Sequence, residues 1–274
     1  MEHKYLDIEN GVVKGFKQGS EQSVVEIPDG VTEIGDGAFK GCKTLTNVTI
    51  SDTVTYIGKE AFAWCDSLVN ITIPNSVTKI DCLAFAECKL LKLVAIPDSV
   101  TKIDVGTFKN CTSLKLVAIS KAMTFIPDKA FENCTSLELV AIPESVTEIG
   151  WYAFKNCKSL NVVVLPKNLT TIGDNAFMGC ESLSFVKFSG SLMEISEGAK
   201  EINRGMTRTQ KPISEVDIPS SVKRIGKGAF QDCRHIKDVS YDGTQSDWGR
   251  IGGNNCGLPK DATVRCTDGE IPIQ

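Results

Sequence analysis

Residues 31–53 read VTEIGDGAFKGCKTLTNVTISDT, and close variants of this 23-residue string follow one another along the chain. The same step separates a series of phenylalanines and a series of cysteines. A fixed period of about 20–50 residues is typical of a stacked array, in which each unit is too short to bury a core alone. The phenylalanines are Phe39, Phe62, Phe85, Phe108, Phe131, Phe154 and Phe177, and the cysteines are Cys42, Cys65, Cys88, Cys111, Cys134, Cys157 and Cys180.

The end of the unit alternates between apolar and polar residues. Val48 and Ile50 are apolar, whereas Asn47 and Thr49 are polar. A period of two predicts a short strand whose apolar side chains face inward. Proline follows this strand in most units and ends it, because proline cannot donate to a strand ladder.

The middle of the unit has a different spacing. Phe39 and Cys42 are three residues apart and would share one face of a helical turn, so the pattern predicts a short helical turn here. Gly35 precedes the turn, at a position that Pro127 occupies in another unit. Proline holds φ near about −65°, so we expect a helix cap at this position and not a left-handed residue. Residues 31–34 predict a second short extended segment.

Composition narrows the class of protein. Of the 274 residues, 42% are hydrophobic and 23% are charged, which is ordinary for a folded soluble chain. The formal net charge of −4 argues against a general nucleic-acid binder. No stretch reaches the roughly 18 consecutive apolar residues of a membrane span, so we expect no membrane insertion. The first residues contain no apolar run, so we expect no secretion signal in this chain, which leaves a cytoplasmic location open.

Eleven cysteines raise the question of disulfides. Eight of them, the seven above and Cys233, hold one repeat position. Equivalent side chains in stacked units run parallel, whereas a disulfide needs two Cβ atoms turned toward each other. We therefore expect buried, reduced thiols that act as small apolar side chains. Cys82, Cys256 and Cys266 lie outside the register, and a bridge between Cys256 and Cys266 remains open.

The run Leu45-x-x-Val48-x-Ile50 resembles the strand of leucine-rich repeats. The full unit, with Ala-Phe-x-x-Cys and Ile-Pro, resembles the BspA-like class, also described from Treponema surface proteins, over roughly residues 20–240. The resemblance implies a leucine-rich-repeat solenoid, a right-handed curved superhelix of 23-residue units with short parallel strands and short helical turns. It further implies a surface protein involved in adhesion and host contact, with no catalytic residues in the motif.

Three regions depart from the regular repeat. We expect an N-terminal cap over residues 1–30, leucine-rich repeats over residues 31–240, and a C-terminal cap over residues 241–274. One unit, residues 192–221, has 30 residues, and its Ala199 is followed by Lys200 where other units have phenylalanine. Residues 200–212 hold the extra length and predict an outward loop.

The outward positions of the predicted strands form the natural binding surface of such an array. In the middle units these positions carry aliphatic residues where polar ones are expected. An exposed contiguous apolar patch usually marks a partner site. Three interpretations remain open: a protein partner, self-association, or tolerated aliphatics covered by neighbours such as Lys92, Lys115 and Glu138. The candidate partner-binding residues are Leu93, Leu116, Leu139, Val162 and Phe185.

A second candidate is basic. Between Lys200 and Lys237 the chain has nine Lys or Arg residues against four Asp or Glu residues. Arg204 and Arg208 of the inserted loop are candidate contacts for an acidic partner or a glycan. A solvated loop without such a role is the alternative, because charge clusters are commonly solvated.

No enzymatic motif is present in the sequence. The chain has two histidines, and it contains no metalloprotease, nucleophile-elbow or phosphate-loop pattern. We expect no cofactor and no metal. The expected function is a non-enzymatic, adhesin-like module that recognises a protein, a host surface protein being one candidate. A passive spacer is the first alternative. Carbohydrate binding ranks lower, because Phe185 is the one aromatic at the outward strand positions. The resemblance implies a cell-surface or secreted location.

Overall fold

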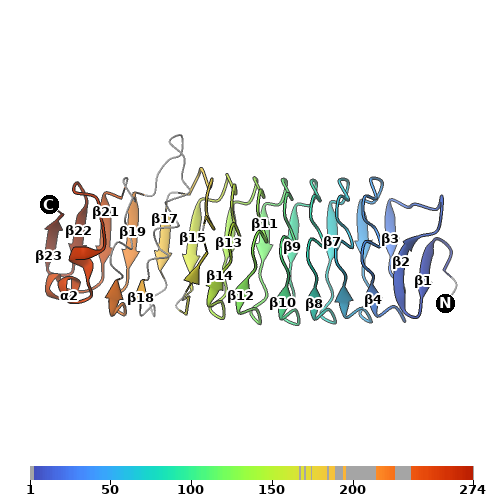
Figure 1. The fold of residues 1–274 in the computed structure, drawn as a ribbon, viewed down its shortest axis with the longest axis horizontal. Coiled ribbons are helices and arrows are strands. Elements are labelled where there is room, and N and C mark those ends of the chain that lie inside the picture. Colours follow the sequence, from blue (N-terminus) through green and yellow to red (C-terminus); the bar gives the residue numbers. More distant parts are fainter. Residues whose placement is uncertain are drawn as a thin grey trace.

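The computed structural model describes residues 3–166, 168–169, 171–173, 175–183, 185–188, 194–195, 214–225 and 236–273. In this part of the chain the 23-residue strings form successive coils of one solenoid, seen in Figure 1 as an elongated row of similar loops. The predicted stack of short units is therefore confirmed.

Each regular coil carries two short strands. One strand ends the repeat and lies on a face that we call the front, and the other follows the start of the repeat and lies on the back. The front strands are β3 (Val24–Glu26), β5 (Asn47–Thr49), β7 (Asn70–Thr72), β9 (Leu93–Ala95), β11 (Leu116–Ala118), β13 (Leu139–Ala141), β15 (Val162–Leu165), β17 (Phe185–Phe188), β19 (Glu215–Ile218) and β21 (Asp238–Tyr241). The back strands are β4 (Glu33–Ile34), β6 (Tyr56–Ile57), β8 (Lys79–Ile80), β10 (Lys102–Ile103), β12 (Phe125–Ile126), β14 (Glu148–Ile149), β16 (Thr171–Ile172), β18 (Glu194–Ile195) and β20 (Arg224–Ile225).

Most neighbouring coils pair through parallel strands in register. Among the described residues the pairing is interrupted between β7 and β9 on the front, and between β10 and β12 and between β16 and β18 on the back. Leu116 of β11 pairs with Leu93 of β9 on one side and with Leu139 of β13 on the other. On the back, Ile34 pairs with Ile57. Equivalent repeat positions therefore form columns along the solenoid axis, spaced by about 4.8 Å as in any β-sheet.

The irregular unit keeps this register. Phe185 pairs with Glu215 on the front, and Glu194 pairs with Arg224 on the back. Both pairs join residues that are 30 apart in sequence, whereas β9 and β11 pair residues that are 23 apart. The expected outward loop of residues 200–212 lies outside the described residues.

The middle of the repeat is not helical, contrary to the prediction of a short helical turn. It is a run of reverse turns, in which the amide of Ala38 donates to the carbonyl of Gly35 and that of Cys42 donates to Phe39. Gly37 and Gly41 adopt φ values of 63° and 74°. The same two positions are left-handed in every coil up to the one that contains Asn175 and Gly179. These two residues interrupt the right-handed backbone that a helix requires.

The left-handed residues redirect backbone amides toward the next coil. Gly37, Phe39 and Gly41 donate to the carbonyls of Lys59, Ala61 and Ala63, with N···O distances of 2.7–2.8 Å. A helix would use these amides internally, four residues back along the chain. The turns instead form a third ladder between coils, beside the front and back strands. The i, i+3 spacing of Phe39 and Cys42 fits both geometries, and for that reason it misled the sequence prediction.

The glycine before the turn has a different explanation. Gly150 is not left-handed, which confirms the sequence argument from Pro127, but it caps no helix. A Cβ atom on Gly150 would lie 2.6 Å from the amide nitrogen of Asp128 in the preceding coil. Close approach between two backbones therefore favours glycine at this position.

The phenylalanines form the predicted internal column. All seven are 0–1% exposed. Successive rings from Phe39 to Phe177 have centroid distances of 5.2–5.7 Å and interplanar angles of 2–11°. Phe16 meets the ring of Phe39 edge-on at 5.2 Å. The core is therefore one continuous spine and not a single central cluster.

Different elements close the two ends of the stack (Figure 1). At the N-terminal end, β1 (Leu6–Glu9) and β2 (Val12–Phe16) form an antiparallel hairpin, and β2 pairs with β4. At the other end are α2 (Gln245–Arg250), the 3-10 turn η1 (Gly253–Asn255), β22 (Thr263–Cys266) and β23 (Gly269–Pro272). Trp248 of α2 is fully buried there. In the part of the chain that the structure describes, no helix has the length and apolar character needed to cross a bilayer.

Candidate protein-binding face

The front strands alternate between the core and solvent. Val94, Val117 and Val140 point inward and are 1% exposed, while the leucines that precede them are 55%, 41% and 49% exposed. A period of two places these leucines on the outer face of the sheet. Val164 is also exposed, at 41%, whereas Val162 is half-buried. We call the outward side chains of β9, β11, β13 and β15 the apolar patch: Leu93, Ala95, Leu116, Ala118, Leu139, Ala141, Val162 and Val164.

Charged neighbours do not cover the patch. Lys115 and Glu138 form an ion pair of 3.4 Å, and their side chains remain 64% and 62% exposed. The leucines beside them keep about half of their surface in contact with solvent. An apolar surface of this kind is stabilised when another surface removes it from water.

Polar segments flank the patch along the axis. On the N-terminal side, β5 and β7 present uncharged groups, and the carboxamide of Asn70 donates to that of Asn47 at 3.1 Å. On the C-terminal side, β19 and β21 carry Glu215, Asp217 and Asp238. Arg265 of β22 lies 2.6 Å from Asp238. Along the front face, the strands β5 and β7 are thus uncharged and polar, β9 to β15 are apolar, and β19 and β21 carry carboxylates, while β3 at the N-terminal end carries the exposed Glu26.

The turn segment of each coil holds the cysteine column. The thiol of Cys65 donates to the carbonyl of Phe39 at 3.0 Å, and the next five cysteines repeat this bond at 3.1–3.2 Å. Burial raises the pKa of Cys65 and of Cys180 from 9.0 to about 12. These thiols are small apolar groups that also satisfy a buried carbonyl, and they are not nucleophiles.

The prediction of free, buried thiols is confirmed for the described column cysteines except Cys42, which is free but not fully buried. The described cysteines are free, and those from Cys65 to Cys180 on the column are buried. Cys42, in the first coil, is half-buried. Cys256 and Cys266 are also free, so the bridge that the sequence left open is not formed. Cys233 lies outside the described residues.

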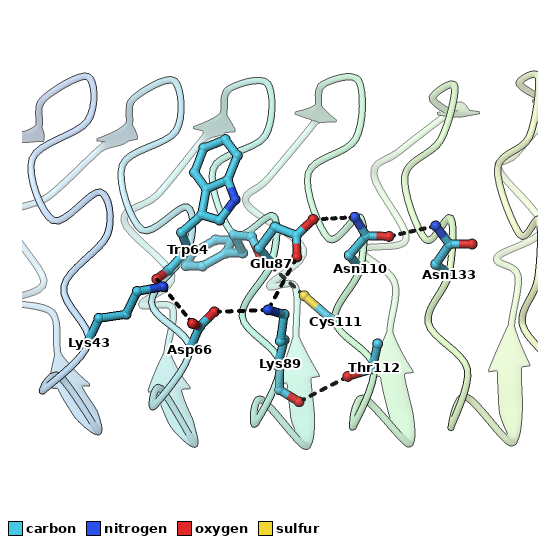
Figure 2. Close-up of polar contacts among 10 residues, drawn as sticks. Lys43, Trp64, Asp66, Glu87, Lys89, Asn110, Cys111, Thr112 and Asn133 are labelled. Carbon is cyan, nitrogen blue, oxygen red and sulfur yellow. Dashed lines mark hydrogen bonds and ion pairs between the residues drawn. The ribbon is translucent and has the colours of Figure 1, made fainter.

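Polar columns run along the turn edge, as Figure 2 shows. Asp66 lies between two lysines of adjacent coils, 2.5 Å from Lys43 and 3.6 Å from Lys89. The hydrogen bond from Lys43 is the main cause that holds the pKa of Asp66 below its usual range. Alternating charges at one repeat position therefore pair across coils, as i, i+4 charges do on a helix.

An amide ladder follows the second left-handed position. Asn110 donates to Glu87, and Asn133 donates to Asn110 at 2.6 Å (Figure 2). In the next coil, Asn156 donates to Asn133 at 2.7 Å. Asparagine tolerates positive φ better than most residues, which suits it to this column. The ladder satisfies these side chains within the molecule.

The family model for the BspA type leucine rich repeat region matches residues 13–138, 107–237 and 200–258, with six copies. The chain belongs to this family. The resemblance that the Ala-Phe-x-x-Cys and Ile-Pro units carry is therefore confirmed.

Solved structures similar to this BspA-type chain come from several bacteria. A leucine rich cell surface protein from Faecalibacterium prausnitzii A2-165 is 29% identical, with 85% of this chain and 83% of that chain covered and a TM-score of 0.41. A leucine-rich repeat protein from Bacteroides ovatus ATCC 8483 is 19% identical, with 98% and 100% covered and a TM-score of 0.47. The leucine rich repeat protein of T. pallidum is 22% identical, with 92% and 90% covered and a TM-score of 0.34. No curated protein matches the sequence.

The structure brings some of the candidate site residues of this BspA-type chain together. Leu93, Leu116, Leu139 and Val162 are adjacent on paired strands. Phe185 pairs with Val162 through its backbone. Its side chain lies outside the described residues, as do Arg204 and Arg208 in full. Val164 is a further residue of the patch. The alternation of inward and outward side chains along β15 is the signal in the sequence that identifies it.

The turn edge carries exposed side chains that the sequence interpretation missed. Trp151 is 59% exposed and Trp64 is 37% exposed, with Lys40 Nζ 4.9 Å from the centroid of the Trp64 ring. A count of aromatic residues only at outward strand positions therefore underestimates the number of exposed aromatic side chains. The exposure of Trp64 and Trp151 could not be predicted, because both lie in the turn segment. The sequence pattern predicted the wrong backbone conformation for that segment. Among the described residues, no group of three or more His, Cys, Asp or Glu could hold a metal ion.

Proposed function

We propose that this chain is a non-enzymatic protein-recognition module of an adhesin-like surface protein, and that the apolar patch contacts the partner. The observation that carries the proposal is the row of half-exposed leucines on β9, β11 and β13. Burying a large aliphatic side chain stabilises a complex by up to about 1.5–3 kcal/mol. Three such residues in register supply a compact hydrophobic centre, which is the usual anatomy of a protein interface.

Location and host contact rest on family membership. The BspA-like resemblance implies a cell-surface or secreted protein, and the proposal extends this expectation to the present chain. A protein surface is the expected partner because the patch is apolar, with polar segments on both sides. Nucleic acid is a poor fit, since the net charge is −4 and the front strand β19 carries Glu215 and Asp217.

Adhesion of coated beads to cultured epithelial cells tests the proposal. Beads carrying the wild-type chain should adhere, and protease treatment of the cells should abolish adhesion. Leu116→Glu combined with Leu139→Glu should also abolish it. Val105→Glu is the matched control, because Val105 is 42% exposed but lies on the turn edge. Adhesion that survives the double substitution would remove the patch from the proposal, and a complete lack of adhesion would favour the passive spacer.

Carbohydrate binding is a second candidate, favoured by the exposed ring of Trp151. Aromatic faces stack on apolar faces of ligands while nearby polar groups form hydrogen bonds. In this case glycosidase treatment of the cells, and not protease treatment, should abolish adhesion. Trp151→Ala should then weaken adhesion, while the double leucine substitution should leave it unchanged.

A further inference from the structure

We infer that two copies of this chain associate face to face through the apolar patch, with their solenoid axes antiparallel. The inference rests on the proposed function in that both use the same face, so self-association would cover the recognition surface until a partner displaces the second copy. Closed pairs with twofold symmetry are the commonest assemblies of identical chains, and they require a self-complementary surface.

The order of the outward side chains is self-complementary in one arrangement. Consider a twofold axis that runs parallel to the strands, midway between β11 and β13. It places β11 over β13 of the second copy and β9 over β15 of the second copy. Leu116 then lies opposite Leu139 of the second copy, and Leu93 lies opposite Val162 of the second copy. At the second outward position, Ala118 lies opposite Ala141 of the second copy, and Ala95 lies opposite Val164 of the second copy. Apolar side chains therefore meet apolar side chains over all four strands.

The charges select this arrangement. Lys115 lies opposite Glu138 of the second copy, which adds to the pair that the two residues form within one chain at 3.4 Å. Further along, Glu215 and Asp217 of β19 face the polar, uncharged β5 of the second copy. If the twofold axis ran along the solenoid instead, the acidic strands β19 and β21 would lie over themselves. Like charges across an interface oppose that alternative.

The size of the face sets the expected strength. The four apolar strands span only about 15 Å, from three gaps of about 4.8 Å. This is too small for the roughly 800 Å² per partner of a standard interface, so the polar strands on both sides must take part. The pair should therefore be weak, with a dissociation constant on the order of micromolar, and readily exchanged for a tighter partner.

Sedimentation equilibrium tests the association. Between about 1 and about 500 µM, the apparent mass should rise from the 29.7 kDa of one chain toward twice that value. The Leu116→Glu, Leu139→Glu variant should remain a single chain, and Val105→Glu should behave as the wild type. A wild-type chain that stays single over this range overturns the inference. Bead adhesion is measured separately, so that result would leave the proposed function standing.

Thr49→Lys tests the orientation by the sign of its effect. Thr49 is exposed on β5 and lies opposite Asp217 of the second copy in the antiparallel pair. The new lysine should lower the dissociation constant about threefold or more, because symmetry repeats the contact twice. In the rejected arrangement β5 lies over β5 of the second copy with its direction reversed, so the introduced lysine would face Asn47, gain no acidic partner and leave association no tighter. Either a weaker or an unchanged association contradicts the antiparallel pair.

Discussion

Two regions of the same repeat differ in how much their residues change from coil to coil. One is the run of reverse turns with its buried phenylalanine and cysteine, which we call the turn column, and the other is the front face. Along the turn column, phenylalanine recurs in seven successive coils and stays buried. Along the front face, the equivalent outward position changes from Asn70 to Leu93, and later to Glu215. Packing between coils constrains the first series, since each ring touches its neighbours above and below. Solvent imposes no such constraint on the second, so the front face is free to acquire a binding role.

The hydrogen bonds of the two regions show the same contrast. Thiols and amides of the turn column bond to the adjacent coil, and the Phe39 carbonyl accepts both an N–H and an S–H. The outward leucines have aliphatic side chains and make no comparable polar contact. Substitutions should therefore affect stability in the turn column and association on the front face, and four experiments examine this difference.

Alkaline pH should produce the largest effect, because it acts on all buried thiols of the turn column together. Burial raises the pKa of Cys65 and Cys180 to about 12, so the folded chain holds these protons more tightly than the unfolded chain does. Stability should be unaffected below about pH 9 and fall above it, by up to about 1.4 kcal/mol per thiol for each pH unit.

Denaturant unfolding with reductant present, at a series of pH values from neutral to strongly alkaline, measures this fall. Cys111→Ala is the comparison, because burial also raises the pKa of that thiol. The variant should lose stability with pH less steeply, by about one proton. Equal slopes for the two chains would contradict the assignment to the thiols, since all other titrating groups are shared.

Phe108→Ala should have the largest effect of any single substitution. Phe108 is fully buried between the rings of Phe85 and Phe131, at centroid distances of 5.3 and 5.7 Å. Removing the ring should lower the free energy of unfolding by about 3–5 kcal/mol. Leu116→Ala on the front face should change it by no more than about 0.5 kcal/mol. Similar losses for the two variants, measured by urea unfolding, would remove the contrast between the regions.

Two glutamates give an intermediate test. Glu132, in the turn column, lies 2.9 Å from Lys109 and 3.6 Å from Lys155, and its side chain is 10% exposed. Glu132→Gln should cost about 1–3 kcal/mol of unfolding free energy, because two partly buried ammonium groups lose their charged partner. Glu138→Gln on the front face is the matched change and should cost at most about 1 kcal/mol. A larger loss for Glu138→Gln, measured by urea unfolding, would contradict this ranking.

Leu116→Glu should have the smallest effect on stability. The side chain is 41% exposed and its replacement leaves the strand ladder intact, so the melting temperature should stay close to that of the wild type. Its effect should appear in bead adhesion and in sedimentation. A substantial fall in melting temperature, measured by circular dichroism, would mean that Leu116 belongs to the core.

Much of the fold followed from particular residues in the sequence. Val48 and Ile50 alternate with polar residues and form the expected inward face of β5 and its continuation. The common step of Phe39 and Cys42 predicted the internal column. The front-face leucines could also be located, because a strand's period of two assigns each residue to one side. The local backbone of the turn was not predictable in this way, since a helical turn and successive reverse turns both satisfy the spacing.

The sequence by itself determined the stack, because side chains repeated every 23 residues can be buried together only if the coils lie in register. It also determined which leucines leave the core. The tertiary structure alone decided where the turn amides point and which tryptophans are exposed. Those features depend on the two left-handed residues in each coil and on contacts with the next coil, and no local pattern of residue types specifies either.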